Sequence, residues 1–358
     1  MTSIQSKGGR RIAVVVFNLG GPDRPEAVQP FLFNLFNDKS IIRLPNPLRL
    51  VLANIVSRRR AKEATKIYAR IGGKSPLLEN TRSQAAALEL ALADLGTVRI
   101  FIAMRYWHPM SDEVAFEVSQ FEPDDTVLLP LYPQFSTTTT ASSLRVWARA
   151  ARAAGLDRPA RTICCYPTEG GFIETFADAI RQAHSAASRH GRPRILFSAH
   201  GLPETIVRDG DPYQWQCEAT AAALVERIAI DGLDWVSCYQ SRVGPLKWIG
   251  PSTEAEIDRA GADGVPIVVA PVAFVSEHSE TLVELDMEYR DRAAEEGVPY
   301  YGRVVTPGAD ERFIGGLATL VRQALAAEAP ICSQRPGRVC PQGWSGCLQP
   351  ERSALAAE

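Results

Sequence analysis

The chain has 358 residues, of which 46% are hydrophobic and 22% are charged. This composition is typical of a folded globular protein and excludes a disordered or collagen-like one, and the length suits two domains of about 150 residues each. The 39 Lys and Arg residues nearly balance the 41 Asp and Glu residues, so the net charge of −2 argues against a protein that binds nucleic acid through its overall charge.

The first apolar run, at residues 12–17, follows a polar and basic N-terminal segment and stops at a Gly-Gly-Pro turn. It is too short for the core of a signal peptide. The longest uncharged apolar run, at 265–275, contains two prolines and is shorter than the ~20 residues of a membrane span. We therefore expect a cytoplasmic protein.

Residues 44–52 are rich in leucine and run toward the basic cluster Arg58, Arg59 and Arg60. An apolar surface beside a basic cluster can rest peripherally on the anionic cytoplasmic face of a membrane. The alternative is a loop and a helix that pack on the body of the protein. The sequence leaves both interpretations open.

Strands and helices alternate along the first half of the chain. Runs of apolar and β-branched residues predict strands at 12–17, 98–103, 126–131 and 161–165, and stretches rich in alanine and leucine predict helices at 83–93 and 142–154. Such alternation is typical of a parallel sheet with helices on both faces.

The second half repeats this layout. It contains predicted strands at 195–199, 234–238 and 267–274 and predicted helices at 215–230, 281–295 and 314–327. We therefore expect an α/β fold of two similar lobes, residues 10–170 and 171–328, with a ligand cleft at the carboxyl ends of the strands. Residues 329–358 lack periodicity and form a short extension with three of the seven cysteines.

His200 stands where the predicted strand 195–199 ends, directly before Gly201. A histidine at a strand end that faces a cleft can accept a proton or bind a metal. The alternative is a histidine that only caps the strand or lies on the surface.

Four glutamates follow the predicted strand 267–274, and they are Glu277, Glu280, Glu284 and Glu288. Once helical, this spacing would bring them to one face, where like charges repel. A stripe of carboxylates beside a cleft could handle cations or protons. The alternative is the solvated acidic face of a surface helix.

Several aromatic, cationic and hydroxyl side chains would together suit a large, flat, anionic ligand, although each aromatic taken singly could belong to the core. They include Arg60, Tyr68, Ser75, Arg105, Tyr106 and Trp248. The chain has no G-x-G-x-x-G motif, and residues 73–75 match only the end of a P-loop, so we expect no nucleotide cofactor.

Nine separate segments carry a resemblance to the ferrochelatases, the lyases that insert Fe2+ into a porphyrin in the last step of haem biosynthesis. They are residues 18–22, 68–76, 104–107, 131–136, 198–203, 210–213, 240–245, 248–251 and 274–282. The resemblance spans about residues 10–330. It implies two Rossmann-like lobes with protoporphyrin held between them.

The resemblance also implies roles for individual residues. The metal-insertion pair would be His200 and Glu280, with Glu277 and Glu284 on a carboxylate path for the metal. The porphyrin propionates would be held by Arg60 and Ser75, and the macrocycle would be lined by Leu19, Tyr68, Arg105, Tyr106 and Trp248. Fe2+ would be a substrate, and its insertion would release two protons.

Some family members carry a [2Fe–2S] cluster with three ligands in the C-terminal extension and one in the body. The extension here contains Cys332, Cys340 and Cys347, whose spacing is wider than in compact ferredoxin-type motifs. Animal members take the fourth ligand from a segment where this chain has Thr137. We predict that Cys165, rather than its neighbour Cys164, replaces it. Free thiols or a zinc site are the alternatives.

Two other functions fit the same residues. One is metal insertion into a related tetrapyrrole, as in a coproporphyrin ferrochelatase or a cobalt-inserting relative. The other is a non-catalytic bilobal protein that binds haem or metal. Because a passive carrier needs no base at the ring, His200 and Glu280 together favour the enzyme.

Overall fold

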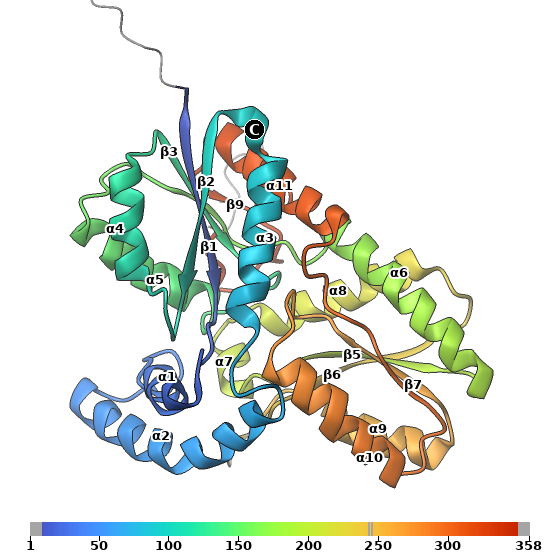
Figure 1. The fold of residues 1–358 in the computed structure, drawn as a ribbon. Coiled ribbons are helices and arrows are strands. Elements are labelled where there is room, and N and C mark those ends of the chain that lie inside the picture. The colour runs from blue at the N-terminus through green and yellow to red at the C-terminus, as the bar shows by residue number, and fades with distance from the viewer. Residues whose placement is uncertain (1–8, 243, 245, 350–358) are drawn as a thin grey trace, which may run out of the picture.

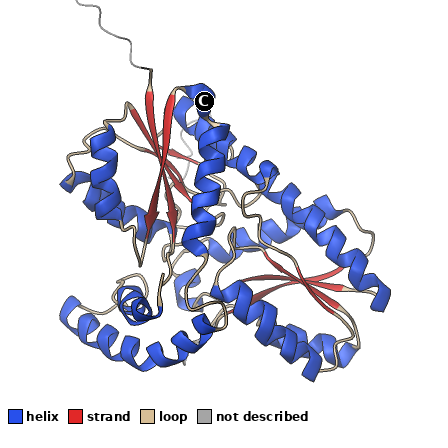
Figure 2. Cartoon of the chain, viewed as in Figure 1, coloured by secondary structure: helices blue, strands red, loops and turns tan. Residues whose placement is uncertain are grey.

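The computed structural model describes residues 9–242, 244 and 246–349. Part of the segment 240–245 and the end of the predicted extension 329–358 therefore lie outside the described residues. The chain forms two sheets whose strands all pair in parallel, as the sequence predicts, and helices lie on both sides of each sheet (Figures 1 and 2). The predicted α/β fold is confirmed.

The first sheet has the strand order β2-β1-β3-β4-β9. Its strands are β1 (Arg11–Asn18), β2 (Thr97–Met104), β3 (Asp125–Pro130), β4 (Arg161–Ile163) and β9 (Ile331–Cys332). The helices of this half are α1 (Val28–Phe36), α2 (Asn46–Ala69), α3 (Leu77–Ala91), α4 (Ser111–Phe121) and α5 (Thr140–Ala153).

The second sheet has the order β6-β5-β7-β8. Its strands are β5 (Arg194–His200), β6 (Asp234–Gln240), β7 (Ile267–Pro271) and β8 (Tyr301–Arg303). The accompanying helices are α6 (Gly170–Ala187), α7 (Glu204–Arg208), α8 (Tyr213–Ile228), α9 (Thr253–Asp263), α10 (Tyr289–Glu295) and α11 (Glu311–Ala326). A π-helical segment, η4 (Glu280–Glu288), leads into α10.

Alternate residues of β1 enter two different cores, because successive side chains of a strand point to opposite faces. Val14 and Val16 belong to a large central core, which also contains residues of α3, α6, α8, α11 and the second sheet. Val15 and Phe17 pack instead against α4 and α5. One continuous core therefore joins the two sheets.

Several predicted elements differ from the structure, and among them the strand expected at 161–165 ends at Ile163, so that Cys164 and Cys165 follow it. The strand expected at 267–274 ends at Pro271, and residues after it form a turn. The helix expected at 281–295 is π-helical over Glu280–Glu288 and α-helical only afterwards. The extension also contributes more than a loop, because Ile331 and Cys332 pair with β4 as a fifth strand of the first sheet.

Candidate active site

His200 is the last residue of β5 and pairs in register with Gln240, the last residue of β6. The chain then turns so closely that a Cβ atom on Gly201 would lie 2.9 Å from the Gln240 carbonyl oxygen and 3.2 Å from the Trp248 ring. Only glycine avoids both contacts. Gly201 therefore lets His200 and Trp248 lie beside the same strand ends.

The orientation of the His200 ring sets its tautomer. Its Nδ1 atom lies 2.6 Å from the Gly201 carbonyl oxygen, which can only accept a hydrogen bond, so Nδ1 carries the proton in the neutral ring. Nε2 is then the basic nitrogen, and it lies 3.8 Å from Glu280 Oε1. The two side chains are 41% and 30% exposed, so both can be reached from outside.

Glu280 has a second histidine beside it. His278 Nε2 lies 3.9 Å from the other oxygen, Oε2. Burial lowers the pKa of His278, although the charge of Glu280 opposes this, so the ring is neutral near pH 7. Glu280 thus lies between two imidazoles, one accessible and one largely buried.

Glu284 is the next carboxylate along η4 and is held by groups at the end of β6. Ser241 donates to it from its amide at 2.8 Å and from its hydroxyl at 2.5 Å, and Gln240 Nε2 donates at 3.1 Å. Burial, and then the charge of Glu280, raise the pKa of Glu284. The two carboxylates are therefore electrostatically coupled, which suits a site that exchanges protons or binds a cation.

Ser241 adopts an unfavourable backbone conformation. Its φ of 60° lies in the left-handed region, which residues other than glycine rarely adopt. This conformation directs both of its donors to Glu284, and such conformations concentrate at functional sites. Glu284 also accepts from the Tyr289 hydroxyl at 3.0 Å, one turn further along.

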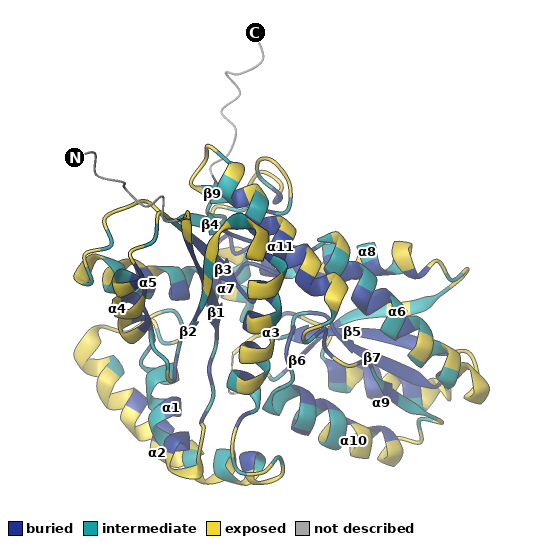
Figure 3. Ribbon diagram, turned by 45° about the horizontal axis from the view of Figure 1, so that its top comes forward, coloured by how far each residue is buried: buried dark blue, intermediate teal, exposed yellow. Residues whose placement is uncertain are grey.

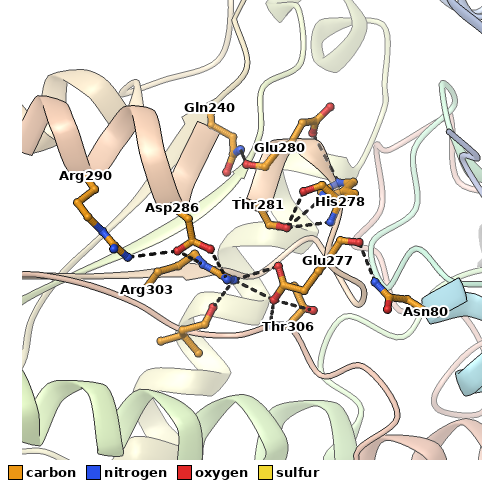
Figure 4. Close-up of polar contacts among 11 residues, drawn as sticks. Asn80, Gln240, Glu277, His278, Glu280, Thr281, Asp286, Arg290, Arg303 and Thr306 are labelled. Carbon is orange, nitrogen blue, oxygen red and sulfur yellow. Dashed lines mark hydrogen bonds and ion pairs between the residues drawn. The ribbon is translucent and has the colours of Figure 1, made fainter. Parts of the chain in front are cut away.

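The predicted stripe of four glutamates is wrong for Glu277, which precedes the helix (Figure 4). Its carboxylate accepts from Arg303 Nη1 at 2.9 Å and from the Thr306 amide at 2.9 Å. Burial opposes ionisation, but the Arg303 charge and these hydrogen bonds hold the pKa of Glu277 below its usual value. Arg303, itself 7% exposed, also pairs with Asp286, so its single positive charge is shared between Glu277 and Asp286.

Glu288, at the end of the predicted stripe, forms an ion pair with Arg70 at 2.9 Å on the surface. Only Glu280 and Glu284 of the four therefore form the coupled pair beside His200.

Tyr68 and Ser75 of the first lobe lie in the last turn of α2 and just before α3. Tyr68 interacts with Ser279, next to Glu280, and burial raises the pKa of its hydroxyl to about 12. Ser75 is buried against Gly21, where a Cβ atom would lie 2.5 Å from the Ser75 hydroxyl. The end of α2 thus meets the segment of the second lobe that carries Glu280.

Arg60 and Leu19 lie further out. Arg60 is exposed on α2, and Leu19 is half-buried against the small core formed by α1 and α2.

Arg105 and Tyr106 are held by a residue that the sequence did not single out. Arg105 Nη2 lies 2.7 Å from Asp38 Oδ2, and the Tyr106 hydroxyl donates to the same oxygen at 2.8 Å. Tyr106 is only 1% exposed, so in this structure it is a core residue. Asp38 belongs to no recognisable sequence motif. It is identified only by its contacts with Arg105 and Tyr106, which lie far along the chain.

Within the described residues, no group of three or more His, Cys, Asp or Glu side chains is arranged to hold a single metal ion. No helix of the described part of the chain is long and apolar enough to cross a membrane.

Comparisons with known proteins agree on one family. A family model described as ferrochelatase matches residues 11–325. The ferrochelatase of Caulobacter vibrioides (strain NA1000 / CB15N) is 52% identical over 341 residues, covering 94% of this chain and 97% of that protein. The ferrochelatase of Hyphomonas neptunium is 53% identical over 348 residues, covering 96% of each.

A solved structure of SirB from Bacillus subtilis with Fe3+ is similar in fold. It has a TM-score of 0.52 and 11% sequence identity, and the match covers 88% of this chain and 96% of that one. The similarity in fold agrees with the much closer sequence relatives and the matched family model: the chain belongs to the ferrochelatase family.

Proposed function

We propose that this chain inserts Fe2+ into protoporphyrin IX and releases two protons, one for each pyrrole N–H that is lost. The observation that carries the proposal is the geometry of His200 and Glu280, an accessible basic Nε2 beside an accessible carboxylate at 3.8 Å. A neutral imidazole can accept a pyrrole proton, and a carboxylate can hold either the second proton or the incoming cation. A non-catalytic carrier would need neither group.

The surroundings of this pair support a substrate bound between the sheets. Tyr68 reaches the segment of Glu280 from the first lobe, and Trp248 packs on Gly201 beside His200. We propose that Ser75 and the exposed Arg60 hold the propionates while Leu19, Tyr68 and Trp248 contact the macrocycle. Arg105 and Tyr106 would line the pocket from their positions around Asp38.

Glu284 would take protons or the metal onward from Glu280, because the two carboxylates are coupled. Glu277 can join such a path only if it leaves Arg303. We therefore propose a supporting role for Glu277 in the packing of the segment before Glu280.

The test is loss of protoporphyrin fluorescence when Fe2+ or Zn2+ is added to the protein without oxygen, with the metalloporphyrin product identified by its absorption. The same assay with coproporphyrin tests the closest alternative, a coproporphyrin ferrochelatase. A protein that binds porphyrin but forms no metalloporphyrin would support the non-catalytic alternative instead.

We also propose that the extension holds a [2Fe–2S] cluster. Interactions with Cys165 and Cys347 lower the pKa of the Cys340 thiol, which also accepts from Gln216 Nε2 at 3.1 Å, and Cys164 Sγ lies 3.5 Å from Cys165 Sγ. Cys332 is fixed beside them, because its carbonyl accepts from the Cys164 amide at 2.8 Å. Thiols of the body and of the extension thus lie in one region, and four cysteine ligands are the set that a [2Fe–2S] cluster uses.

The position of Thr137 supports the same site. A Cβ atom on Gly346 would lie 3.1 Å from the Thr137 methyl group, so the extension packs over the segment that supplies a ligand in animal members. Here Cys165 would replace that ligand, with Cys332, Cys340 and Cys347 as the other three. Held there, the cluster would tie the extension to the first sheet.

The cluster is expected to depend on Cys165 but not on Cys164. Cys165→Ser should remove the visible absorption and the acid-labile sulfide of the purified protein, because the thiol of Cys165 interacts with that of Cys340 in the extension. Cys164→Ser is the matched control, because it is the adjacent, equally buried thiol. A wild-type protein without labile sulfide would contradict the cluster, and loss only in Cys164→Ser would reverse the assignment.

Peripheral membrane contact would use helix α2, which lies at the edge of the molecule with an exposed outer face (Figure 3). Leu48, Val51 and Ile55 are 60%, 61% and 44% exposed and share one side of this helix. Arg58, Arg59 and Arg60 follow within the same helix and are exposed. Apolar and basic side chains together would favour an anionic lipid surface.

Sedimentation with vesicles tests this contact. The wild type is expected to bind vesicles containing phosphatidylglycerol more strongly than vesicles of phosphatidylcholine alone, and Val51→Gln should weaken the binding. Leu90→Gln, at a leucine 79% exposed on α3, is the control for loss of one surface apolar group. Equal binding of Val51→Gln and the wild type would contradict the proposal.

A further inference from the structure

Helix α3 connects the proposed propionate site to the segment that carries Glu280. Ser75 stands just before the helix, and its amide donates to the Pro22 carbonyl at 2.7 Å. Further along the helix, Asn80 and Gln84 are one turn apart and contact residues 275–277 of the second lobe. Helix α3 therefore links Ser75, where we propose that a porphyrin propionate binds, to residues 275–277, which lead to Glu280.

Gln84 is 2% exposed and uses all of its side-chain hydrogen-bonding groups on the second lobe. Its Nε2 donates to the carbonyl oxygens of Val275 and Gly308, both at 2.9 Å. Its Oε1 accepts from the Ser276 hydroxyl at 2.9 Å. A buried amide with every group paired fixes one relative position of the two elements it joins, because a displacement would leave a buried polar group unpaired.

Asn80 adds a contact closer to the chemistry. Its Nδ2 donates at 2.9 Å to the carbonyl oxygen of Glu277, three residues before Glu280 (Figure 4). Asn80 and Gln84 together therefore hold the backbone of residues 275–277 along one face of α3.

The helix itself is firmly anchored in the first lobe. The Thr81 hydroxyl accepts from Asn18 Nδ2 at 3.2 Å, at the end of β1, and donates to the Leu77 carbonyl at 2.7 Å. Leu88 belongs to the central core. From Leu77 to Gln84 the helix rises ~10 Å. This length fixes the distance between Ser75, just before the helix, and the contacts that Gln84 makes with the second lobe.

We propose that Gln84, assisted by Asn80, is a positioning residue that sets where Glu280 and His278 lie relative to a porphyrin held at Ser75. This inference rests on the proposed function. Proton transfer and metal insertion need the reacting groups at a set distance from the ring nitrogens, and a misplacement of ~1 Å can cost about 10²-fold in rate. Porphyrin affinity, which depends on other residues, should not depend on this contact.

Gln84→Met keeps the length of the side chain and removes its hydrogen bonds. We expect kcat for Zn2+ or Fe2+ insertion to fall by at least ~10-fold, with the Kd for protoporphyrin, measured by fluorescence titration, within about twofold of the wild type. The matched control is Gln134→Met. Gln134 is also 2% exposed, and it also donates across the lobes, to Thr220 Oγ1 at 2.9 Å and Val272 O at 3.0 Å.

Asn80→Ala keeps the inference testable if Gln84→Met does not fold, because it removes a single hydrogen bond at a half-buried position. It should lower kcat by about threefold with unchanged porphyrin Kd. Amide hydrogen exchange over residues 275–281 should become faster in both variants and not in Gln134→Met.

The outcomes separate the two proposals. A wild type that inserts no metal would refute the proposed function, and hydrogen exchange would still decide on the positioning contact. If the wild type is active but Asn80→Ala and a folded Gln84→Met both match Gln134→Met in kcat and in hydrogen exchange, the positioning role is refuted. The proposed function is then unaffected.

Discussion

Replacement of His200 by alanine is expected to lower kcat for metal insertion by about 10²- to 10⁴-fold, the contribution usual for a positioned general base. The Gly201 carbonyl fixes the proton on Nδ1 at 2.6 Å, so only Nε2 can accept one, and alanine leaves no base in its place. The side chain is 41% exposed, so its removal should cost little stability. The measurement is kcat for Zn2+ and Fe2+ insertion, with the protoporphyrin Kd from fluorescence titration.

His184→Ala provides the control for His200→Ala. His184 lies on α6, away from the strand ends, and its ring is 3.4 Å from the Ser188 hydroxyl. It should leave kcat within about twofold of the wild type, because it removes an imidazole without touching the site. Full activity in His200→Ala would refute its assignment as the base, whereas loss of porphyrin binding alone would make His200 a binding residue.

The strands that position this base could be predicted from the sequence because both sheets are parallel. Strands of parallel sheets are buried on both faces and therefore read as continuous apolar runs, such as 12–17 and 195–199. The polar residues that follow them, Asn18 and His200, stand at the carboxyl ends, where ligands of α/β folds bind. Strand β9 has no such run. It forms because it pairs with β4, which is far away in the sequence, so no local pattern predicts it.

The arrangement of charges around the site was harder to predict, since the partners lie far apart in the chain. Spacing alone placed Glu277 on a stripe with Glu280, but Arg303 pairs with it from β8. Likewise, Asp38 accepts from Arg105, and nothing in the neighbouring sequence indicates this buried ion pair. Charge pairing of this kind depends on the tertiary fold, and sequence periodicity carries no information on it.

The π-helical geometry of η4 was not predictable for a related reason. Its residues suit an α-helix, and the expected spacing of three and four residues assumes one. The wider π-helical turn instead makes residues five positions apart neighbours, and the Tyr289 hydroxyl donates to Glu284 at 3.0 Å. Local widening of a helix frequently marks a functional site, and here the π-helical segment begins at Glu280.

Glu280→Gln is expected to lower kcat by about 10²-fold, because the neutral amide can neither accept a proton nor attract the cation. It should also change the pH dependence of the remaining activity. After burial, the charge of Glu280 is the main cause that raises the pKa of Glu284, so removing this charge lowers that pKa. If the acidic limb of the kcat profile reflects deprotonation of Glu284, it moves to lower pH in the variant.

Glu288→Gln is the matched control for Glu280→Gln, because it removes a carboxylate from the same helical segment. Glu288 pairs with Arg70 on the surface, 48% exposed, and such pairs contribute about 0–1 kcal/mol to stability. Its kcat and pH profile should match the wild type. An acidic limb that stays in place in Glu280→Gln would show that Glu284 does not control it, and unchanged kcat in that variant would remove Glu280 from the metal-insertion pair.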